Sequence, residues 1–204
     1  MEDTTPLEKI ADQHRAEILG VAASVIRGAV RGCSDDADLD RFALDEPWAS
    51  VHLDGAFVSL YAGDVLRSCR GSLESGVPLR KSLVRAAESA CHDFRFAPLD
   101  PKELDGLTIG VALLYDRVIV DTEPARRAEA VVVGEHGIIL SSGTRSGLLL
   151  PVVGRRYGWT ADEFLDATCK KADLARGAWR YDDVVMETFK AVELEGDFAE
   201  LTER

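Results

Sequence analysis

The chain has 204 residues, of which 46% are hydrophobic, and its formal net charge at pH 7 is −12. This length and composition are typical of a globular domain, and the acidic charge argues against nucleic-acid binding. No apolar run approaches the roughly 20 residues that cross a bilayer, and the acidic N-terminus does not resemble a signal peptide. We therefore expect a cytoplasmic protein that has no membrane segment and whose cysteines are free thiols.

The first part of the chain predicts one long helix followed by a loop. Apolar residues recur at helical spacing over 5–31, and Thr5 is placed to cap this helix. The acidic stretch that follows has no periodicity, so 32–55 is expected to be a loop. It lacks the glycine and the terminal glutamate of a calcium-binding loop.

Residues 56–73 predict a β-hairpin. Their side chains alternate with the period of a strand on both sides of Gly63-Asp64, a familiar two-residue connection between antiparallel strands. The returning strand carries Cys69 between two arginines. Alternation places the Arg67 side chain on the same face as Cys69.

A second helix is expected to open at Pro78, with a buried stripe that includes Cys91 and Phe94. The next segment, 107–120, is strand-like throughout. A second hairpin is expected between 131–134 and 137–140, turned at 135–136.

The last part of the chain predicts two helices and a strand. A short helix over 151–157 should end at Gly158, and Thr160 with Glu163 forms a capping box for the next helix. That helix should bury Cys169. Alternation over 184–194 predicts a last strand, and the polar tail 195–204 is expected to be frayed.

Short connections between these elements favour antiparallel strands. The predicted class is therefore α+β, with a mostly antiparallel sheet flanked by helices. The length of 1–204 suits a single domain, or two small lobes that share a core.

Two interpretations of Cys69 follow from its neighbours. Guanidinium groups stabilise a thiolate, which would make Cys69 a nucleophile or a metal ligand. Alternatively, Cys69 is a small buried side chain, and the arginines turn outward to water. Gly71 is better explained by a close backbone approach or a bulge than by chemistry.

Two further residues are candidates for a site. His136 could supply a base to Cys69, although its place in a predicted turn is equally that of a hairpin tip. Arg145, in a glycine-rich turn, could contact an anion. The single cysteines and histidines have no ligand spacing, so the sequence predicts no metal and no other cofactor.

Several motifs in this order resemble the AMMECR domain family over nearly the whole chain, from about residue 16 to 194: FVSL (57–60), LRSCRGSL (66–73), DFRFAPL (93–99), EHGIIL (135–140), SGLLLPVV (146–153) and GWTADEFLDATCKKADL (158–174). The resemblance implies a two-lobed α+β fold and a cytosolic protein that is often associated with Memo-type and radical SAM proteins. No reaction is established for the family. Its cysteine-containing signature, the proposed functional site, falls on Leu66, Arg67, Ser68, Cys69, Arg70 and Gly71.

The chain departs from the family pattern at four positions. Ser68 replaces a glycine, and Arg70 replaces an aliphatic residue. Gly110 stands where the family commonly has a glutamate, and Val152 where it commonly has a glutamine. If that glutamate is an acid or base in the family, this chain has lost it.

Two functions are therefore compatible with the sequence. The first is a binding or adaptor domain that works with a Memo-type or radical SAM partner. The alternative is a cysteine-dependent enzyme acting on a small anionic or macromolecular substrate. In that case Cys69 would be nucleophile or ligand, His136 would be a base, and the substrate would contact Arg67, Ser68, Arg70, Gly71 and Arg145.

Overall fold

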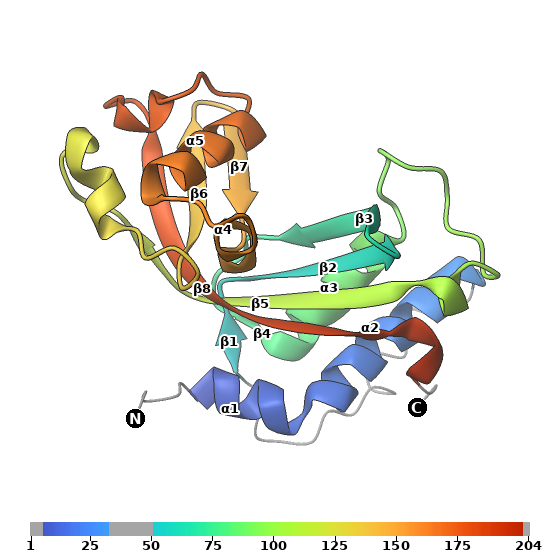
Figure 1. The fold of residues 1–204 in the computed structure, drawn as a ribbon. Coiled ribbons are helices and arrows are strands. Elements are labelled where there is room, and N and C mark those ends of the chain that lie inside the picture. Colours follow the sequence, from blue (N-terminus) through green and yellow to red (C-terminus); the bar gives the residue numbers. More distant parts are fainter. Residues whose placement is uncertain (1–5, 33–50, 202–204) are drawn as a thin grey trace. The chain divides into compact units, whose positions relative to one another are not determined.

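The computed structural model describes residues 6–32 and 51–201. The chain divides into two compact units: unit 1 is Met1–Leu113 with Val192–Arg204, and unit 2 is Leu114–Ala191. Two long strands, β5 (Thr108–Ile119) and β8 (Val185–Asp197), have residues in both. Helices and antiparallel strands occur in each unit, which confirms the predicted α+β class (Figure 1).

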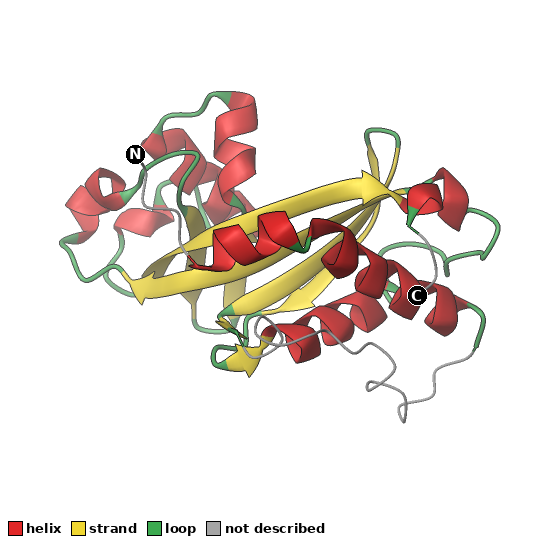
Figure 2. Cartoon of the chain, turned by 90° about the horizontal axis from the view of Figure 1, so that it is seen from below, coloured by secondary structure: helices red, strands yellow, loops and turns green. Residues whose placement is uncertain are grey.

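Unit 1 contains four strands in the order β3-β2-β5-β8, a small two-stranded sheet, and helices α1 to α3. Figures 1 and 2 show its helices running along the strands. Its further elements are α1 (Pro6–Gln13), α2 (Arg15–Val30), β1 (His52–Leu53), β2 (Gly55–Ala62), β3 (Val65–Ser72), β4 (Val77–Pro78), α3 (Leu79–Ala90), and the 3-10 helices η3 (Leu104–Gly106) and η6 (Phe198–Glu200).

The predicted N-terminal helix is two helices that meet at His14. Its backbone hydrogen bonds continue across the junction, from His14 N to Ile10 O and from Ile18 N to His14 O. The proposed cap, Thr5, lies outside the described residues, as does most of the predicted loop 32–55. The end of that loop is a strand instead, because β1 pairs antiparallel with β4.

The predicted hairpin is confirmed as β2 and β3, joined at Gly63-Asp64 with Gly63 at a φ of 58°. The pairing shifts by one residue at Arg67, because Leu60 faces Ser68 whereas Tyr61 faces Leu66. Arg67 is therefore the extra residue of a β-bulge, which bends a strand and redirects its side chains.

The core of unit 1 lies between the hairpin and helices α2 and α3. Helix α3 packs on β2 and β3, and α2 packs on α3. The fully buried side chains include Ile18, Ile26, Val58, Leu60, Leu79, Leu83 and Ile109. Phe94 was expected in this core but is 82% exposed, because α3 ends at Ala90 and the helical periodicity ends with it.

The prediction of a frayed C-terminal tail is wrong for residues 195–201. Strand β8 continues to Asp197, and Phe198 follows it with no exposed surface. Buried Arg27 donates to Phe198 O at 2.9 Å and to Leu201 O at 2.7 Å. These bonds hold the C-terminal segment against α2. The polar composition of the segment does not reveal this anchoring, because Arg27 binds backbone oxygens.

Unit 2 has the strand order β5-β8-β6-β7. Its elements are η4 (Pro124–Ala130), β6 (Gly137–Ser142), β7 (Arg145–Leu149), α4 (Pro151–Tyr157), α5 (Ala161–Lys171) and η5 (Ala178–Arg180). The hairpin is β6–β7, turned at Gly143-Thr144. The predicted strand over 131–134 is wrong, because an isolated bridge between Val133 and His136 is the only described pairing there.

Both predicted helix termini in unit 2 are confirmed. Gly158 ends α4 in the left-handed conformation at a φ of 62°. Thr160 and Glu163 form the capping box of α5. The core of this unit is a cluster that includes Ile138, Leu140, Phe164, Leu165, Cys169, Trp179 and Met186. No described helix is long and apolar enough to span a membrane.

Candidate functional site

Cys69 lies near the middle of β3, which is the edge strand of unit 1. It is a free, half-buried thiol. Cys69 faces Ser59 directly on β2, and residues that face each other on antiparallel strands share one side of the sheet. The thiol is therefore on the side opposite Ser68, whose fully buried hydroxyl donates to Ala90 O of α3 at 2.6 Å.

A row of three positions crosses the sheet at Cys69. A Cβ atom on Gly110 of β5 would lie 3.8 Å from Ser59 Cβ, so Gly110, Ser59 and Cys69 occupy neighbouring strands on one side. The space at Gly110 accepts a side chain with ordinary contacts. The glutamate that the family resemblance places here would thus stand in line with the thiol, and this chain has no side chain there.

Asp93 and Arg95 close the free edge of β3, and we call this pair the Asp93–Arg95 clasp. Asp93 Oδ2 accepts the backbone N–H of Cys69 at 3.0 Å, and Arg95 Nη2 donates to Cys69 O at 2.9 Å. Two further bonds join the side chains, at 2.9 Å from Arg95 Nε to Oδ1 and at 2.6 Å from Nη2 to Oδ2. The clasp thus supplies both bonds that a neighbouring strand would make.

The ion pair within the clasp keeps both the Asp93 carboxylate and the Arg95 guanidinium charged. The Asp93 side chain is only 2% exposed. Hydrogen bonding from Arg95 holds the pKa of Asp93 well below its usual range, against the opposing effect of burial, and the backbone N–H of Cys69 adds to this lowering. The same pairing raises the pKa of Arg95. Asp93 is therefore a structural carboxylate and not a proton acceptor near neutral pH.

Arg67, predicted to bind an anionic group, is paired within the protein. Its Nε and Nη2 donate to the two Glu103 carboxylate oxygens at 2.9 and 2.8 Å, and Nη2 also donates to Pro98 O at 3.0 Å. The bond from Arg67 lowers the pKa of Glu103. Together with the clasp, this pair holds segment 93–103 against β3.

Gly71 serves close packing of the backbone. A Cβ atom there would lie 2.0 Å from Ala56 O and 2.7 Å from Phe57 Cα, both backbone atoms of the paired strand. No side chain fits without moving β2. This distance agrees with the expectation of a close backbone approach at Gly71.

Half-buried Arg70 and exposed Phe94 form an aromatic–cationic pair next to the clasp. The Arg70 guanidinium carbon lies 5.4 Å from the centroid of the Phe94 ring, within the range of a cation–π interaction. Arg70 Nε is buried and has no hydrogen-bond partner among the described residues. Arg95 lies at the same 5.4 Å distance from the Phe96 ring.

His136 and Arg145 belong to unit 2. Nδ1 of His136 accepts the backbone N–H of Val132 at 3.2 Å, so this ring closes a local turn. Arg145 opens β7, faces Ser142 and is exposed. Their assignments as base and anion contact remain predictions, and the structure groups only Arg67, Ser68, Cys69, Arg70 and Gly71 on one strand.

The roles of Asp93, Arg95 and Glu103 are not among the sequence predictions. Asp93 and Arg95 lie in the DFRFAPL motif of the family resemblance, which gives them no function, and Glu103 lies in none of the motifs. An Asp-x-Arg pair directly after a helix is a usable signal, but its partner on β3 is distant in sequence. No group of three or more potential metal ligands occurs in the ranges 6–32 and 51–201.

Comparison with known proteins gives consistent matches. A sequence model of the AMMECR1 family matches residues 21–194. Protein TV1384 of Thermoplasma volcanium is 36% identical over 136 residues, which are 66% of this chain and 68% of that protein. Protein TK0174 of Thermococcus kodakarensis is 37% identical over 150 residues, covering 71% and 73%. The crystal structure of uncharacterized protein PH0010 from Pyrococcus horikoshii superposes with a TM-score of 0.79 at 29% identity, over 91% of this chain and 92% of that one.

Proposed function

The chain belongs to the AMMECR1 family, and we propose that it is a binding domain whose partner docks on the exposed side chain of Phe94 and on the half-buried Arg70 beside it. The observation that carries this proposal is the 82% exposure of a phenylalanine in a segment that is otherwise tightly held. Aromatic and arginine side chains contribute most to many protein–protein interfaces.

The surroundings of Phe94 support a preformed surface. Asp93 and Arg95, its two chain neighbours, are tied to the backbone of Cys69, and Arg67 is tied to Pro98 and Glu103. A rigid segment loses little conformational entropy when it binds. Phe94 is thus an anchor whose position is set before any partner arrives.

The charged groups near Cys69 favour binding over catalysis. Arg67 and Asp93 are each engaged in a bidentate ion pair, and Gly110 provides no acid or base. General acid–base catalysis requires a side chain that is free to accept or donate a proton, and binding of an anionic substrate requires a cation that is not already paired. In unit 1 these groups serve to hold segment 93–103 instead.

The partner should carry a carboxylate beside an apolar side chain. The Arg70 guanidinium lies beside the ring of Phe94, and charge-assisted hydrogen bonds from a guanidinium to carboxylates are strong. The family resemblance points to Memo-type or radical SAM proteins as the partner class, and we propose one of these as the occupant.

The test uses purified proteins. The dissociation constant for a Memo-type and for a radical SAM protein from the same genome would be measured by calorimetry. We expect Phe94→Ala to weaken binding about 30-fold, as for an anchor worth about 2 kcal/mol. Tyr157→Ala is the matched control, because Tyr157 is 64% exposed on unit 2. Equal affinity of wild type and Phe94→Ala, or no binding of either protein, would sink the proposal.

A second proposal, the cysteine-dependent enzyme, is favoured by one observation. The Cys69 thiol is half-buried and not sealed in the core, and it shares a side of the sheet with Ser59 and the open position at Gly110. Intact mass spectrometry after incubation with small anionic esters and thioesters would detect a covalent adduct. The adduct should persist in Cys91→Ser and disappear in Cys69→Ser.

A further inference from the structure

A pocket of about 430 Å³ lies in unit 2, where helix α5 ends and the chain turns back. It is lined by Asp166, Ala167, Lys170, Asp173, Leu174 and Arg176. Its volume is within the range of roughly 300–1,000 Å³ found for small-molecule sites. None of these residues belongs to β3, the strand that carries Cys69, and none is part of the proposed docking pair, Phe94 and Arg70.

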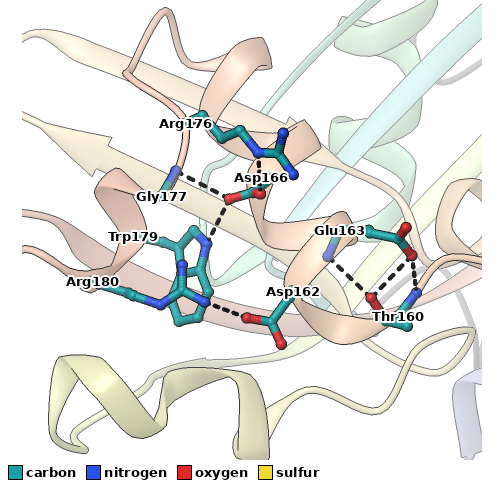
Figure 3. A network of polar contacts seen from close by, with 8 residues as sticks. All are labelled: Thr160, Asp162, Glu163, Asp166, Arg176, Gly177, Trp179 and Arg180. Atoms are coloured by element: carbon teal, nitrogen blue, oxygen red, sulfur yellow. Dashed lines mark hydrogen bonds and ion pairs between the residues drawn. The ribbon is translucent and has the colours of Figure 1, made fainter.

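Asp166, which lines this pocket, accepts three hydrogen bonds, and Figure 3 shows them. Its Oδ1 accepts from Gly177 N and from Trp179 Nε1, both at 3.0 Å, and its Oδ2 accepts from Arg176 Nε at 2.8 Å. Burial opposes ionisation of Asp166, but the bonds from Arg176, Trp179 and Gly177 outweigh it and lower the pKa. The loop after α5 is therefore held in place without a ligand.

The rim of the pocket presents charges of both signs. The Lys170 ammonium and the Asp173 carboxylate are exposed, and neither has a hydrogen bond or ion pair with the described residues. Arg176 uses Nε for Asp166, and its two outer nitrogens face solvent at 86% side-chain exposure. Leu174 and Ala167 supply the apolar part of the lining.

We infer that this pocket binds a small zwitterion, namely a free amino acid with an aliphatic side chain. Lys170 and the outer nitrogens of Arg176 would bind the carboxylate, since both are cationic donors. Asp173 would bind the ammonium group, and the aliphatic side chain would contact Leu174. A ligand with a single charge would leave either the cationic or the anionic part of the rim unpaired.

Three probes that share one carbon skeleton test this assignment. Leucine carries both charges, leucinamide lacks the carboxylate, and 4-methylpentanoate lacks the ammonium group. Amide chemical-shift changes in ¹⁵N-labelled protein would be followed at millimolar ligand concentrations. Leucine should shift the amides of residues 166–176 and bind more tightly than either single-charge probe. Equal binding of all three, or no shift with leucine, would overturn the inference.

Charge variants give an independent readout of each contact. Lys170→Ala should weaken leucine and 4-methylpentanoate about threefold, as expected for an exposed ion pair, and leave leucinamide unchanged. Asp173→Asn should weaken leucine and leucinamide and spare 4-methylpentanoate. Lys171→Ala is the matched control, because Lys171 is exposed on the same helix but does not line the pocket. A loss with Lys171→Ala as large as that with Lys170→Ala would show nonspecific charge effects and refute the site.

Discussion

The carboxylate of Asp93 accepts the backbone N–H of Cys69 at 3.0 Å, and through this bond a side chain takes the place of a neighbouring strand. Arg95 completes the replacement by donating to Cys69 O at 2.9 Å. Edge strands expose unpaired backbone groups that promote aggregation unless they are covered. The clasp covers the edge of β3 beside the half-buried thiol.

Removal of the Asp93 charge should destabilise unit 1 in a pH-dependent way. The folded-state pKa of Asp93 is lowered, chiefly by the bond from Arg95, so its contribution is present above the unfolded pKa of about 3.9 and is lost as pH falls below it. We expect Asp93→Asn to lower the free energy of unfolding by about 2 kcal/mol at pH 7. The difference from wild type should narrow in denaturant titrations below about pH 4.

Asp64→Asn is the control for this experiment. Asp64 is an exposed residue of the hairpin turn, so its neutralisation should leave stability within about 0.5 kcal/mol of wild type. A pH-independent difference between Asp93→Asn and wild type would contradict an ionised Asp93 in the folded protein.

The three described cysteines should differ in their rates of alkylation. Cys169 is fully buried. The pKa of Cys91 is raised to about 12, mainly by burial and also by the negative charge of nearby Glu88. Since the thiolate is the reactive form, Cys91 should react slowly at pH 8 although it is half-buried like Cys69. Peptide mapping by mass spectrometry should therefore find Cys69 modified first. Modification of Cys169 before Cys69 in the folded protein would show that the described burial is wrong.

Two glycines provide a matched test of the hairpin geometry. Gly71→Ala places a Cβ 2.0 Å from the backbone oxygen of Ala56, so β2 must move, at a cost of about 3 kcal/mol or more. Gly110→Ala meets its nearest atom, Ser59 Cβ, at 3.8 Å, and should change stability by less than about 1 kcal/mol. Thermal unfolding of both variants measures the contrast. Similar melting temperatures would refute the close approach.

Much of the fold could be predicted from local patterns. The turn at Gly63-Asp64, the left-handed Gly158 and the capping box at Thr160 depend on residues a few positions apart, and the structure confirms each. The strand expected over 131–134 failed because an apolar run is ambiguous without a partner strand. The frayed tail failed because its burial depends on Arg27, far away in the sequence.

The same distinction explains what could be foreseen of the candidate site. Alternation placed Cys69 on a strand beside arginines, but it could not show that Arg67 is the extra residue of a bulge and is paired with Glu103. Phe94 was expected in a helical stripe because its spacing fits, yet α3 ends before it. The sequence contains no capping signal that would place the end of α3 at Ala90.

Buried and exposed phenylalanines should respond very differently to truncation. Phe198 has no exposed surface and packs under the Arg27 guanidinium carbon, 4.7 Å from its ring centroid. Phe198→Ala should cost about 3–5 kcal/mol of unfolding free energy. Phe94→Ala, at 82% exposure, should cost less than about 0.5 kcal/mol. Chemical denaturation of the pair checks this, and a stable Phe198→Ala protein would contradict the anchored C-terminal segment.

The division of unit 1 into two stretches of chain has a consequence for synthesis on the ribosome. Unit 2 is continuous over Leu114–Ala191, whereas unit 1 needs Val192 onward to supply its part of β8 and the buried Phe198. Because the chain is synthesised from its N-terminus at about 5–20 residues per second, the part of β8 that belongs to unit 1 is made several seconds after residue 113. The nascent protein thus completes its second core before its first, because Arg27 of α2 has no Phe198 to bind until the C-terminal segment has emerged.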